Sequence, residues 1–356
     1  MHYLVIRQSS FGDVLLAHPV LAEVTRKYPK VKFTFLSNPI YKPFFENIDN
    51  LTYFGANTKK EYKGPSGIFK LKKDLINANS FDGIIDLHNV LRSRVLSKLL
   101  RIKTYRIQKG RQEKRALTRR YSKAFNALKH TTQRYADVFS SAGLPVEIKQ
   151  LSKELNNDKK SATTAYLDEK FAKSKASKEF KQFIASEKKK YKIFLAISPF
   201  SLQKMKCLPK KTMIELINVL KENISTRIYL IGAPGEKKDI EAFAKGSNIL
   251  NVAGKFTFYD EIALFHNLDL LITMDSANLH LAGLCNTRNL SIWGPTHPYS
   301  GFSPITTQSY LLQRDDLNCR PCSIYGNKPC YRKDFACMNG IKAADIVKKI
   351  ESILKK

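Results

Sequence analysis

The feature of this sequence that most restricts its fold is a regular alternation of short apolar runs with longer segments in which apolar residues recur at helical spacing. Four runs in the first half have the length and composition of strands, at 2–7, 32–37, 50–55 and 82–88. Helical spacing is found at 13–29, 67–78 and 92–100. Strands and helices that alternate at these intervals predict a parallel sheet with helices on both faces.

The second half of the chain repeats the alternation. Its predicted strands lie at 191–198, 226–232, 248–254, 270–275 and 288–295. Its predicted helices lie at 210–222, 236–245, 258–268 and 278–285, and an amphipathic helix ends the chain. We therefore predict an α/β protein with two Rossmann-like, doubly wound domains that face each other across a cleft, which suits a length of 356 residues.

Composition suggests where these domains begin and end. We expect an N-terminal domain over 1–150, a Lys-rich helical linker over 151–190 and a C-terminal domain over 191–335. The last segment, 336–356, is expected to be a helix that packs back on the N-terminal domain.

The charge of the chain is one-sided, with 61 Lys and Arg against 31 Asp and Glu and a net charge of +30. Such a balance attracts anions, although a Lys-rich solvated surface accounts for part of it. Residues 101–134 hold twelve basic residues and a single acid, Glu113, and therefore form a one-signed patch. Residues 158–192 mix eleven Lys with five acids, which is typical of an exposed helical segment.

The sequence contains no pattern for a membrane span or a secretion signal. Its longest apolar runs are much shorter than the ~18 residues that cross a bilayer, and Met1 leads directly into a strand-like run. We expect a soluble cytoplasmic protein, in which disulfides are rare.

Four of the six cysteines form a cluster near the C-terminus: Cys319, Cys322, Cys330 and Cys337. The first two have the spacing of a zinc site, but the second two are farther apart than such a site usually requires. We expect no metal and no cofactor, and a structural zinc at these four cysteines is the alternative.

Candidate binding loops follow the predicted strands, because ligands of open parallel sheets bind at the carboxyl ends of strands. In the second half these loops are small and polar: SPFSLQK, GAPGE, DSANLH and GPTHP. The third places the backbone N–H groups of Ala277, Asn278 and Leu279 at the start of a helix, which is a ready anion site. Ser276 adds a hydroxyl donor, whereas Asp275 or Ser276 as a plain helix cap is the structural alternative.

Motifs of several common enzyme classes are absent from the sequence. It has no G-x-G-x-x-G after the first strand, and no G-x-x-x-x-G-K-[ST], H-E-x-x-H or G-x-S-x-G. It also lacks D-x-D, which argues against a glycosyltransferase that holds its nucleotide through a divalent metal. Phosphates of a bound nucleotide would then be neutralised by lysine, serine and helix N-termini, and Lys206 is well placed for this.

The stretch RQSSFGDVLLAHP, at 7–19, is the candidate site of the first half. It places an acid, Asp13, after a Ser-rich turn and a glycine, where helical spacing begins. On the residues alone, Asp13 is either a plain helix cap or a carboxylate that the helix dipole keeps ionised as a base.

Six segments, in order, resemble glycosyltransferase family 9, the ADP-heptose:lipopolysaccharide heptosyltransferases. They are LVIRQSSFGDVLLAHPVL, FDGIIDLHNVLRS, SPFSLQKMKCLPKKTM, NVAGKFTFYDEIALFHNLDLLITMDSANLHLAG, SIWGPTHP and CRPCSIYGNKPCYRKDFACM. The resemblance implies two domains of the GT-B type, with the acceptor in the N-terminal domain and the nucleotide sugar in the C-terminal domain. It also implies an inverting, metal-independent transfer of heptose from ADP-heptose to a lipopolysaccharide core acceptor.

The resemblance further implies roles for single residues. Asp13 matches the catalytic aspartate, Lys206 the lysine on the donor phosphates, and Asp275 the aspartate that contacts the donor sugar. The expected donor-binding residues are Ser198, Ser201, Lys206, Gly232, Glu236, Asp275, Ser276, Ala277, Asn278 and His280. The expected acceptor-binding residues are Ser9, Ser10, Gly12, His88, Arg92, Arg111, Arg115, Arg119 and Arg120.

Two positions depart from the family pattern. Ala277 stands where the family usually has glycine, and Leu208 stands where it usually has tryptophan. The first adds a methyl group where the backbone approaches phosphate, and the second removes an aromatic wall. A glycosyltransferase of the same fold that uses another nucleotide sugar for surface polysaccharide is therefore the main alternative.

The one-signed basic patch fits a phosphorylated glycolipid acceptor at an anionic membrane surface. We expect the protein to lie peripherally at the cytoplasmic face of the inner membrane, where basic residues near the surface each contribute about 1 kcal/mol. A basic nucleic-acid-binding protein is the distant alternative, but 101–134 offers few aromatic residues for base stacking, so we expect no nucleic acid. Intact Asp13 and Lys206 favour an enzyme over a relative that only binds saccharide.

Overall fold

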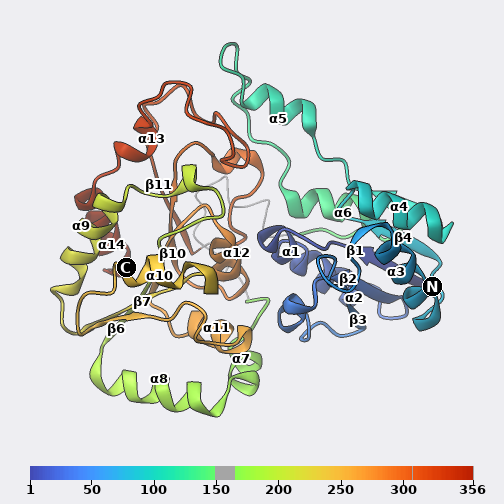
Figure 1. The fold of residues 1–356 in the computed structure, drawn as a ribbon, viewed down its shortest axis with the longest axis horizontal. Helices are drawn as coiled ribbons and strands as arrows, with labels where there is room; N and C mark the ends of the chain where they lie inside the picture. The colour runs from blue at the N-terminus through green and yellow to red at the C-terminus, as the bar shows by residue number, and fades with distance from the viewer. Residues whose placement is uncertain (149–164, 307, 356) are drawn as a thin grey trace. The chain divides into compact units, whose positions relative to one another are not determined.

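The computed structural model describes residues 1–148, 165–306 and 308–355, which divide into two compact units (Figure 1). Of these residues, 1–110 and 129–148 form the first unit, and 111–128 and 165–355 form the second. Each unit is built on one sheet whose paired strands are parallel, with helices on its faces. The predicted fold class, an α/β protein with two Rossmann-like domains, is therefore confirmed.

The sheet of the first unit has five strands in the order β3-β2-β1-β4-β5. Its strands are β1 (His2–Ile6), β2 (Lys32–Ser37), β3 (Leu51–Gly55), β4 (Gly83–Asp86) and β5 (Thr104–Arg106). Its helices are α1 (Phe11–Leu15), α2 (His18–Lys27), the 3-10 helix η1 (Pro39–Phe44), α3 (Gly64–Ala78), α4 (Leu91–Leu100) and α6 (Thr131–Ser141). The central strands are buried on both faces, which is why they read as continuous apolar runs.

Two layers of helices cover this sheet. Leu71 and Leu75 of α3 and Leu96 of α4 share one core with apolar strand residues such as Leu4. On the opposite face α6 packs against α2 and against the strands, and the ring of Phe139 lies 6.1 Å from that of Phe33. The loops that follow β1 and β4 lie side by side, because these two strands are paired neighbours.

The sheet of the second unit has six strands in the order β11-β10-β9-β6-β7-β8. Its strands are β6 (Ile193–Ser198), β7 (Thr226–Leu230), β8 (Ile249–Asn251), β9 (Leu270–Met274), β10 (Asn289–Trp293) and β11 (Ser309–Gln313). Its helices are α5 (Arg111–Leu117), α7 (Glu169–Lys175), α8 (Lys178–Lys190), α9 (Lys210–Lys221), α10 (Lys237–Glu241), α11 (Phe258–Phe265), α12 (Ala277–Leu284), α13 (Ala336–Asn339) and α14 (Ala343–Leu354), with the 3-10 helices η3 (Lys204–Lys206), η4 (Pro234–Glu236) and η5 (Pro298–Ser300).

The C-terminal helix α14 belongs to the second unit. Its apolar stripe of Ile346, Ile350 and Ile353 is buried in the core of that unit, and the helix packs against α9. The expectation that 336–356 packs back on the N-terminal domain is therefore wrong, because the stripe completes the core formed by its own sheet.

The Lys-rich region before β6 is a covering layer of the second unit where the structure describes it. Helix α8 buries Phe180 and Ile184, and its Glu187 forms an ion pair with Arg227 of β7. Helix α7 packs against α11. The predicted helical character of this region is confirmed for α7 and α8, but 165–190 is not a free linker, and 151–164 lie outside the described residues.

The segment 111–128, expected within an N-terminal domain over 1–150, also belongs to the second unit. Lys123 Nζ donates hydrogen bonds to the carbonyl oxygens of Asn318 at 3.1 Å and Arg320 at 2.7 Å. The backbone N–H of Leu128 donates to the carbonyl oxygen of Tyr299 at 2.9 Å. These contacts place that part of the basic patch on the second unit and correct the predicted boundary.

Among the helices of the described ranges, none is both long enough and apolar enough to cross a membrane.

Candidate functional site

The first candidate site lies at the carboxyl end of β1, where the chain turns into the short helix α1. Ser10 precedes this helix, and its Oγ donates a hydrogen bond to Asp13 Oδ2 at 2.7 Å. Arg7, the first residue after β1, places Nη2 at 2.6 Å from the same carboxylate oxygen. The carboxylate is therefore oriented by one cation and one hydroxyl group, both from the loop that leads into its own helix.

Arg7 is the functional residue that the sequence prediction missed. Its side chain is only 8% exposed, whereas that of Asp13 is 23% exposed. Its Nη1 donates to the carbonyl oxygen of Leu87 at 2.8 Å, and its guanidinium carbon lies 5.8 Å from the centre of the Tyr135 ring. A charged residue directly after a buried strand was the available signal, because that position faces the binding edge of a parallel sheet.

His88 brings the loop after β4 into the same site. Its Nε2 lies 3.5 Å from Ser9 Oγ, and its Nδ1 is buried without a hydrogen-bond partner in the described ranges. Burial, with the nearby charges of Arg7 and Lys109, lowers the pKa of His88 to about 3. The imidazole is therefore neutral near pH 7. Asp86 holds this loop in place, since its Oδ1 accepts the backbone N–H of His88 at 3.0 Å.

The predicted acceptor residues fall into three places. Ser9, Ser10, Gly12 and His88 lie at the carboxyl edge of the first sheet with Asp13. Arg92 lies on α4, and its Nη1 donates to the carbonyl oxygen of Tyr62 at 2.7 Å. Four predicted residues lie in the segment that belongs to the second unit, namely Arg111, Arg115, Arg119 and Arg120.

The second candidate site lies at the carboxyl ends of β6 and β9, which are paired neighbours. Lys206, in the loop after β6, places Nζ at 3.2 Å from Oδ2 of Asp275, the first residue after β9. Both side chains are largely buried, with exposed fractions of 13% for the lysine and 11% for the aspartate. Ser201 Oγ donates to the backbone carbonyl oxygen of Asp275 at 3.0 Å. The structure thus joins two loops that are far apart in the sequence.

The start of α12 completes this second site. Asn278 Nδ2 donates to Ser198 Oγ at 2.9 Å, which ties the helix to the end of β6. Ser276 Oγ lies 3.0 Å from Thr273 Oγ1 and makes no side-chain cap on the helix. The backbone N–H of Leu279 donates to the carbonyl oxygen of Ser276 at 3.3 Å, so this group is used within the helix. Ala277 is the first helical residue and His280 is buried on the same helix.

The loop after β7 carries the remaining predicted donor residues. Glu236 Oε2 accepts the backbone N–H of Ala233 at 2.8 Å, and a Cβ atom at Gly232 would lie 2.7 Å from that oxygen. Gly232 is therefore required for the close approach of this loop to the glutamate. In the described ranges no hydrogen bond or ion pair joins Gly232 or Glu236 to Lys206 or Asp275.

The Cys-rich segment, residues 319–337, packs against the side chain of Lys206. Gly326 has a φ of +74°, and a Cβ atom there would lie 2.4 Å from Lys206 Cγ. The lysine stem therefore runs directly against the backbone of this segment. Leu208, two residues later, is buried in the core of the second unit. Leu208, at the position where the family usually has tryptophan, is therefore a core residue in this chain.

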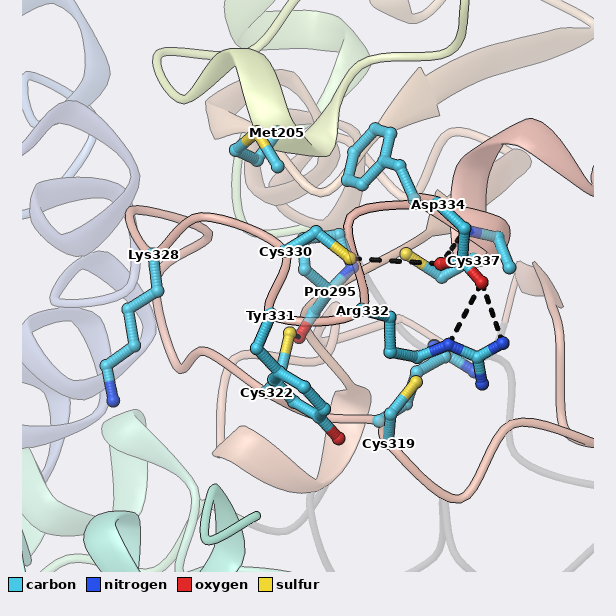
Figure 2. Close-up of a pocket in the computed structure, with 13 residues that line it drawn as sticks. Met205, Pro295, Cys319, Cys322, Lys328, Cys330, Tyr331, Arg332, Asp334 and Cys337 are labelled. Atoms are coloured by element: carbon cyan, nitrogen blue, oxygen red, sulfur yellow. Dashed lines mark hydrogen bonds and ion pairs between the residues drawn. The ribbon is translucent and has the colours of Figure 1, made fainter.

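The four clustered cysteines line one pocket of the second unit (Figure 2). Cys330 Sγ lies 4.0 Å from Asp334 Oδ1, and burial raises the pKa of the Cys322 thiol and that of Cys337, the latter to about 12. Across the described ranges, no three His, Cys, Asp or Glu side chains are placed so that they hold a metal ion. This geometry gives no support to the alternative of a structural zinc ion at Cys319, Cys322, Cys330 and Cys337.

Comparisons with known proteins agree on one family. The family described as "Glycosyltransferase family 9 (heptosyltransferase)" matches residues 68–329. The chain is 22% identical over 316 residues to the lipopolysaccharide core heptosyltransferase OpsX of Haemophilus influenzae, covering 86% of this chain and 81% of that protein.

Two solved structures show the same fold. The glycosyl transferase family 9 protein of Veillonella parvula matches with a TM-score of 0.73 at 16% identity, covering 99% of this chain and 97% of the other. The E. coli heptosyltransferase WaaC, solved with ADP, matches with a TM-score of 0.64 at 18% identity, covering 99% of this chain and 100% of the other.

Proposed function

Because the chain belongs to glycosyltransferase family 9, we propose that it transfers heptose from ADP-heptose to a lipopolysaccharide core acceptor, with inversion and without a metal ion. The observation that carries this proposal is the partly exposed carboxylate of Asp13, held by Arg7 and Ser10 at the carboxyl edge of the first sheet. Two relatives support the substrates, since OpsX is named for the lipopolysaccharide core and the WaaC structure contains ADP.

Asp13 is the general base of the proposed reaction. It takes the proton of the acceptor hydroxyl group while that oxygen forms a bond to the anomeric carbon of the donor sugar. The bond from the anomeric carbon to the phosphate oxygen breaks, and its electron pair leaves with ADP. Because the nucleophile attacks the face opposite the leaving group, the configuration inverts. Arg7 and Ser10 keep the carboxylate in one orientation, so little reorganisation is needed at the moment of proton transfer.

Lys206 is the group that stabilises the departing nucleotide. Negative charge grows on the phosphate oxygen as the sugar leaves, and a nearby cation lowers the energy of that transition state. Lys206 now faces Asp275 at 3.2 Å, and a bound diphosphate would give the ammonium group a second anionic partner. The start of α12, with Ser276 and Ala277, adds hydroxyl and backbone donors. The first unit thus binds the acceptor, and the second binds the nucleotide sugar.

The basic segment of the second unit is proposed to dock an anionic membrane surface, at the cytoplasmic face of the inner membrane. Arg111, Arg115 and Arg119 are exposed on or just after α5. Lys114 Nζ lies 5.0 Å from the centre of the Phe302 ring, which anchors α5 to its unit. Replacing Arg115 and Arg119 with Gln should weaken binding to anionic vesicles at low salt, since such attraction is screened within about 8 Å at physiological salt.

A different nucleotide sugar is the second candidate for the donor. Ala277 adds a methyl group at the first residue of α12, and Leu208 places an aliphatic side chain in the core. Both replace residues that the family usually carries near the nucleotide sugar. A donor screen by thermal shift, with ADP-heptose beside other nucleotide sugars, separates the two candidates.

The direct test is incubation with ADP-heptose and a truncated lipopolysaccharide acceptor, followed by mass spectrometry. We expect the acceptor to gain the mass of heptose and EDTA to leave the rate largely unchanged. Strict dependence on added Mg²⁺ or Mn²⁺ would contradict the metal-independent mechanism. If the enzyme transferred sugar only from another nucleotide sugar, that compound would be the donor in place of ADP-heptose.

A further inference from the structure

A basic groove lies on the flank of the first unit, between α4 and β5. Its volume is about 580 Å³, within the range of roughly 300–1,000 Å³ that is usual for small-ligand sites. Four cationic side chains line it, those of Arg94, Lys98, Arg101 and Arg106, together with the hydroxyl-bearing Ser97 and Thr104. No acidic residue contributes to its lining.

The four cations are not neutralised by the described parts of the protein. None of them forms an ion pair with a carboxylate of the described ranges, whereas Lys70 of the same unit pairs with Glu61 at 3.0 Å. All four side chains are exposed. An anion from solution would relieve the mutual repulsion of these four cations. The hydroxyl groups of Ser97 and Thr104 already donate to backbone carbonyl oxygens, at 2.8 Å and 2.9 Å, so the cations are the groups of the lining that can bind it.

The groove is coupled to the edge of the sheet that carries Asp13. Arg94 Nε donates to Asn89 Oδ1 at 2.7 Å, and Asn89 Nδ2 donates to the carbonyl oxygen of Ile107, just after β5, at 3.0 Å. Asn89 is the neighbour of His88, whose ring lies 3.5 Å from Ser9. One wall of the groove is thus fixed to the loop that borders the predicted acceptor site.

We infer that this groove is a binding subsite for a phosphate group on the acceptor, held by Lys98, Arg101 and Arg106 while Arg94 keeps its bond to Asn89. The inference rests on the proposed function, because it assigns the anionic part of that acceptor to a place on the first unit. Arginine suits the role, since its guanidinium binds a phosphate through two parallel hydrogen bonds. The subsite separates acceptor recognition from membrane docking, which falls to the basic segment of the second unit.

The test uses the double variant Lys98→Gln with Arg106→Gln, and Lys30→Gln with Lys32→Gln as a charge-matched control. The control pair is exposed at the amino end of β2 and does not line the groove. Acceptor KM is measured with a phosphorylated acceptor and with the same acceptor after phosphatase treatment. Binding of inorganic phosphate is measured separately by calorimetry at low salt, with excess ADP present to fill the donor site.

We expect the groove variant to raise the KM for the phosphorylated acceptor by roughly tenfold, as the loss of two exposed charge contacts predicts. The KM for the dephosphorylated acceptor and the donor KM should be unchanged, and the control should match the wild type throughout. Phosphate binding should weaken in the groove variant alone.

Three results would overturn the inference. One is an unchanged KM for the phosphorylated acceptor when phosphate binding is lost, which would make the groove a site for free phosphate only. Another is an equal KM change with both acceptor forms. The third is an equal effect of the control pair, which would reduce the groove to general surface charge. If no variant transfers sugar but phosphate binding still depends on the groove, the proposed function fails and the anion site stands.

Discussion

The two units each present an acid–cation pair at the carboxyl edge of a parallel sheet, but the two pairs differ in which group is exposed. In the first unit Arg7 is 8% exposed and Asp13 is 23% exposed, with 2.6 Å between Nη2 and Oδ2. In the second unit Lys206 and Asp275 are buried to similar extents, with 3.2 Å between Nζ and Oδ2. The first pair buries its cation and leaves its acid open to solvent, and the second does not.

We propose that this difference separates the group that reacts from the group that supports it. Arg7 is also bound to the carbonyl oxygen of Leu87, so it stays in place and the carboxylate beside it is the group that can meet a substrate. Lys206 holds its ammonium group 3.2 Å from Asp275, with donors left for a second anion. In this proposal the acid acts in the first unit and the cation in the second, and each of the following predictions tests one part of the contrast.

The largest effect is expected at Asp13. Asp13→Asn keeps the shape of the side chain but removes its ability to accept a proton, so kcat should fall by roughly 10²–10⁴. Donor KM should stay near the wild-type value because the proposed donor site lies in the other unit. Steady-state kinetics with both substrates varied will check this. Turnover close to that of the wild type would show that Asp13 is no more than a helix residue.

Lys206 should give the next largest effect, and of a different kind. Lys206→Ala removes a charge-assisted contact to phosphate, so kcat/KM for the donor should fall by about 10- to 100-fold. Acceptor KM should change little. The contrast would be broken if Lys206→Ala and Asp13→Asn altered the same kinetic constants in the same proportion.

Gly326 offers a smaller and more local perturbation of the second pair. Gly326→Ala introduces a methyl group 2.4 Å from Lys206 Cγ and should raise donor KM by roughly tenfold, because a small displacement of the ammonium group is costly. Gly143→Ala is the matched control, since Gly143 has a similar φ of +82° but open space around it. Both variants should lose about 1–2 kcal/mol of stability through backbone strain. Equal donor KM values in the two variants would exclude contact with Lys206 as the cause.

The smallest effect is expected on the pH dependence of stability. It comes from His88, in the loop after β4, and His297, in the loop after β10. The pKa of His88 is lowered to about 3 and that of His297 to about 4, mainly by burial, whereas an unfolded histidine has a pKa near 6.5. Between these values the unfolded chain binds more protons, so stability should fall as pH decreases from about 6.5 toward about 4. His88→Gln should flatten this dependence, as seen in melting temperatures at pH 7.5 and pH 5. An unchanged slope would mean that His88 does not stay neutral in the folded protein.

Much of the fold could be predicted because buried parallel strands leave continuous apolar runs. Strands β1 to β4 and β6 to β10 lie within predicted ranges, whereas the edge strands β5 and β11 do not. The edge strand β5 has only three residues, two of them half-buried, and so leaves no such run. The predicted helix 13–29 is two helices, α1 and α2, because Pro19 cannot donate to a preceding turn and instead occupies the first turn of α2.

The candidate site could be predicted in part. Asp13 lies in the first turn of α1, Asp275 directly follows β9, and Lys206 lies four residues before α9. The roles of all three could be predicted from the resemblance to the family. Their partners could not be selected in the same way, since the approach of Arg7 to Asp13 depends on side-chain direction in three dimensions. The unit against which α14 packs could not be predicted either, because an apolar stripe indicates that a helix is buried but not against which sheet.

The account is tested most directly by calorimetric titration of ADP into the wild type, Asp13→Asn and Lys206→Ala. We predict that ADP binds Asp13→Asn with wild-type affinity and binds Lys206→Ala at least about tenfold more weakly, because the proposed mechanism assigns the nucleotide to the second pair alone. Equal affinity for all three proteins, or a loss confined to Asp13→Asn, would contradict the assignment of the acid to one unit and the cation to the other.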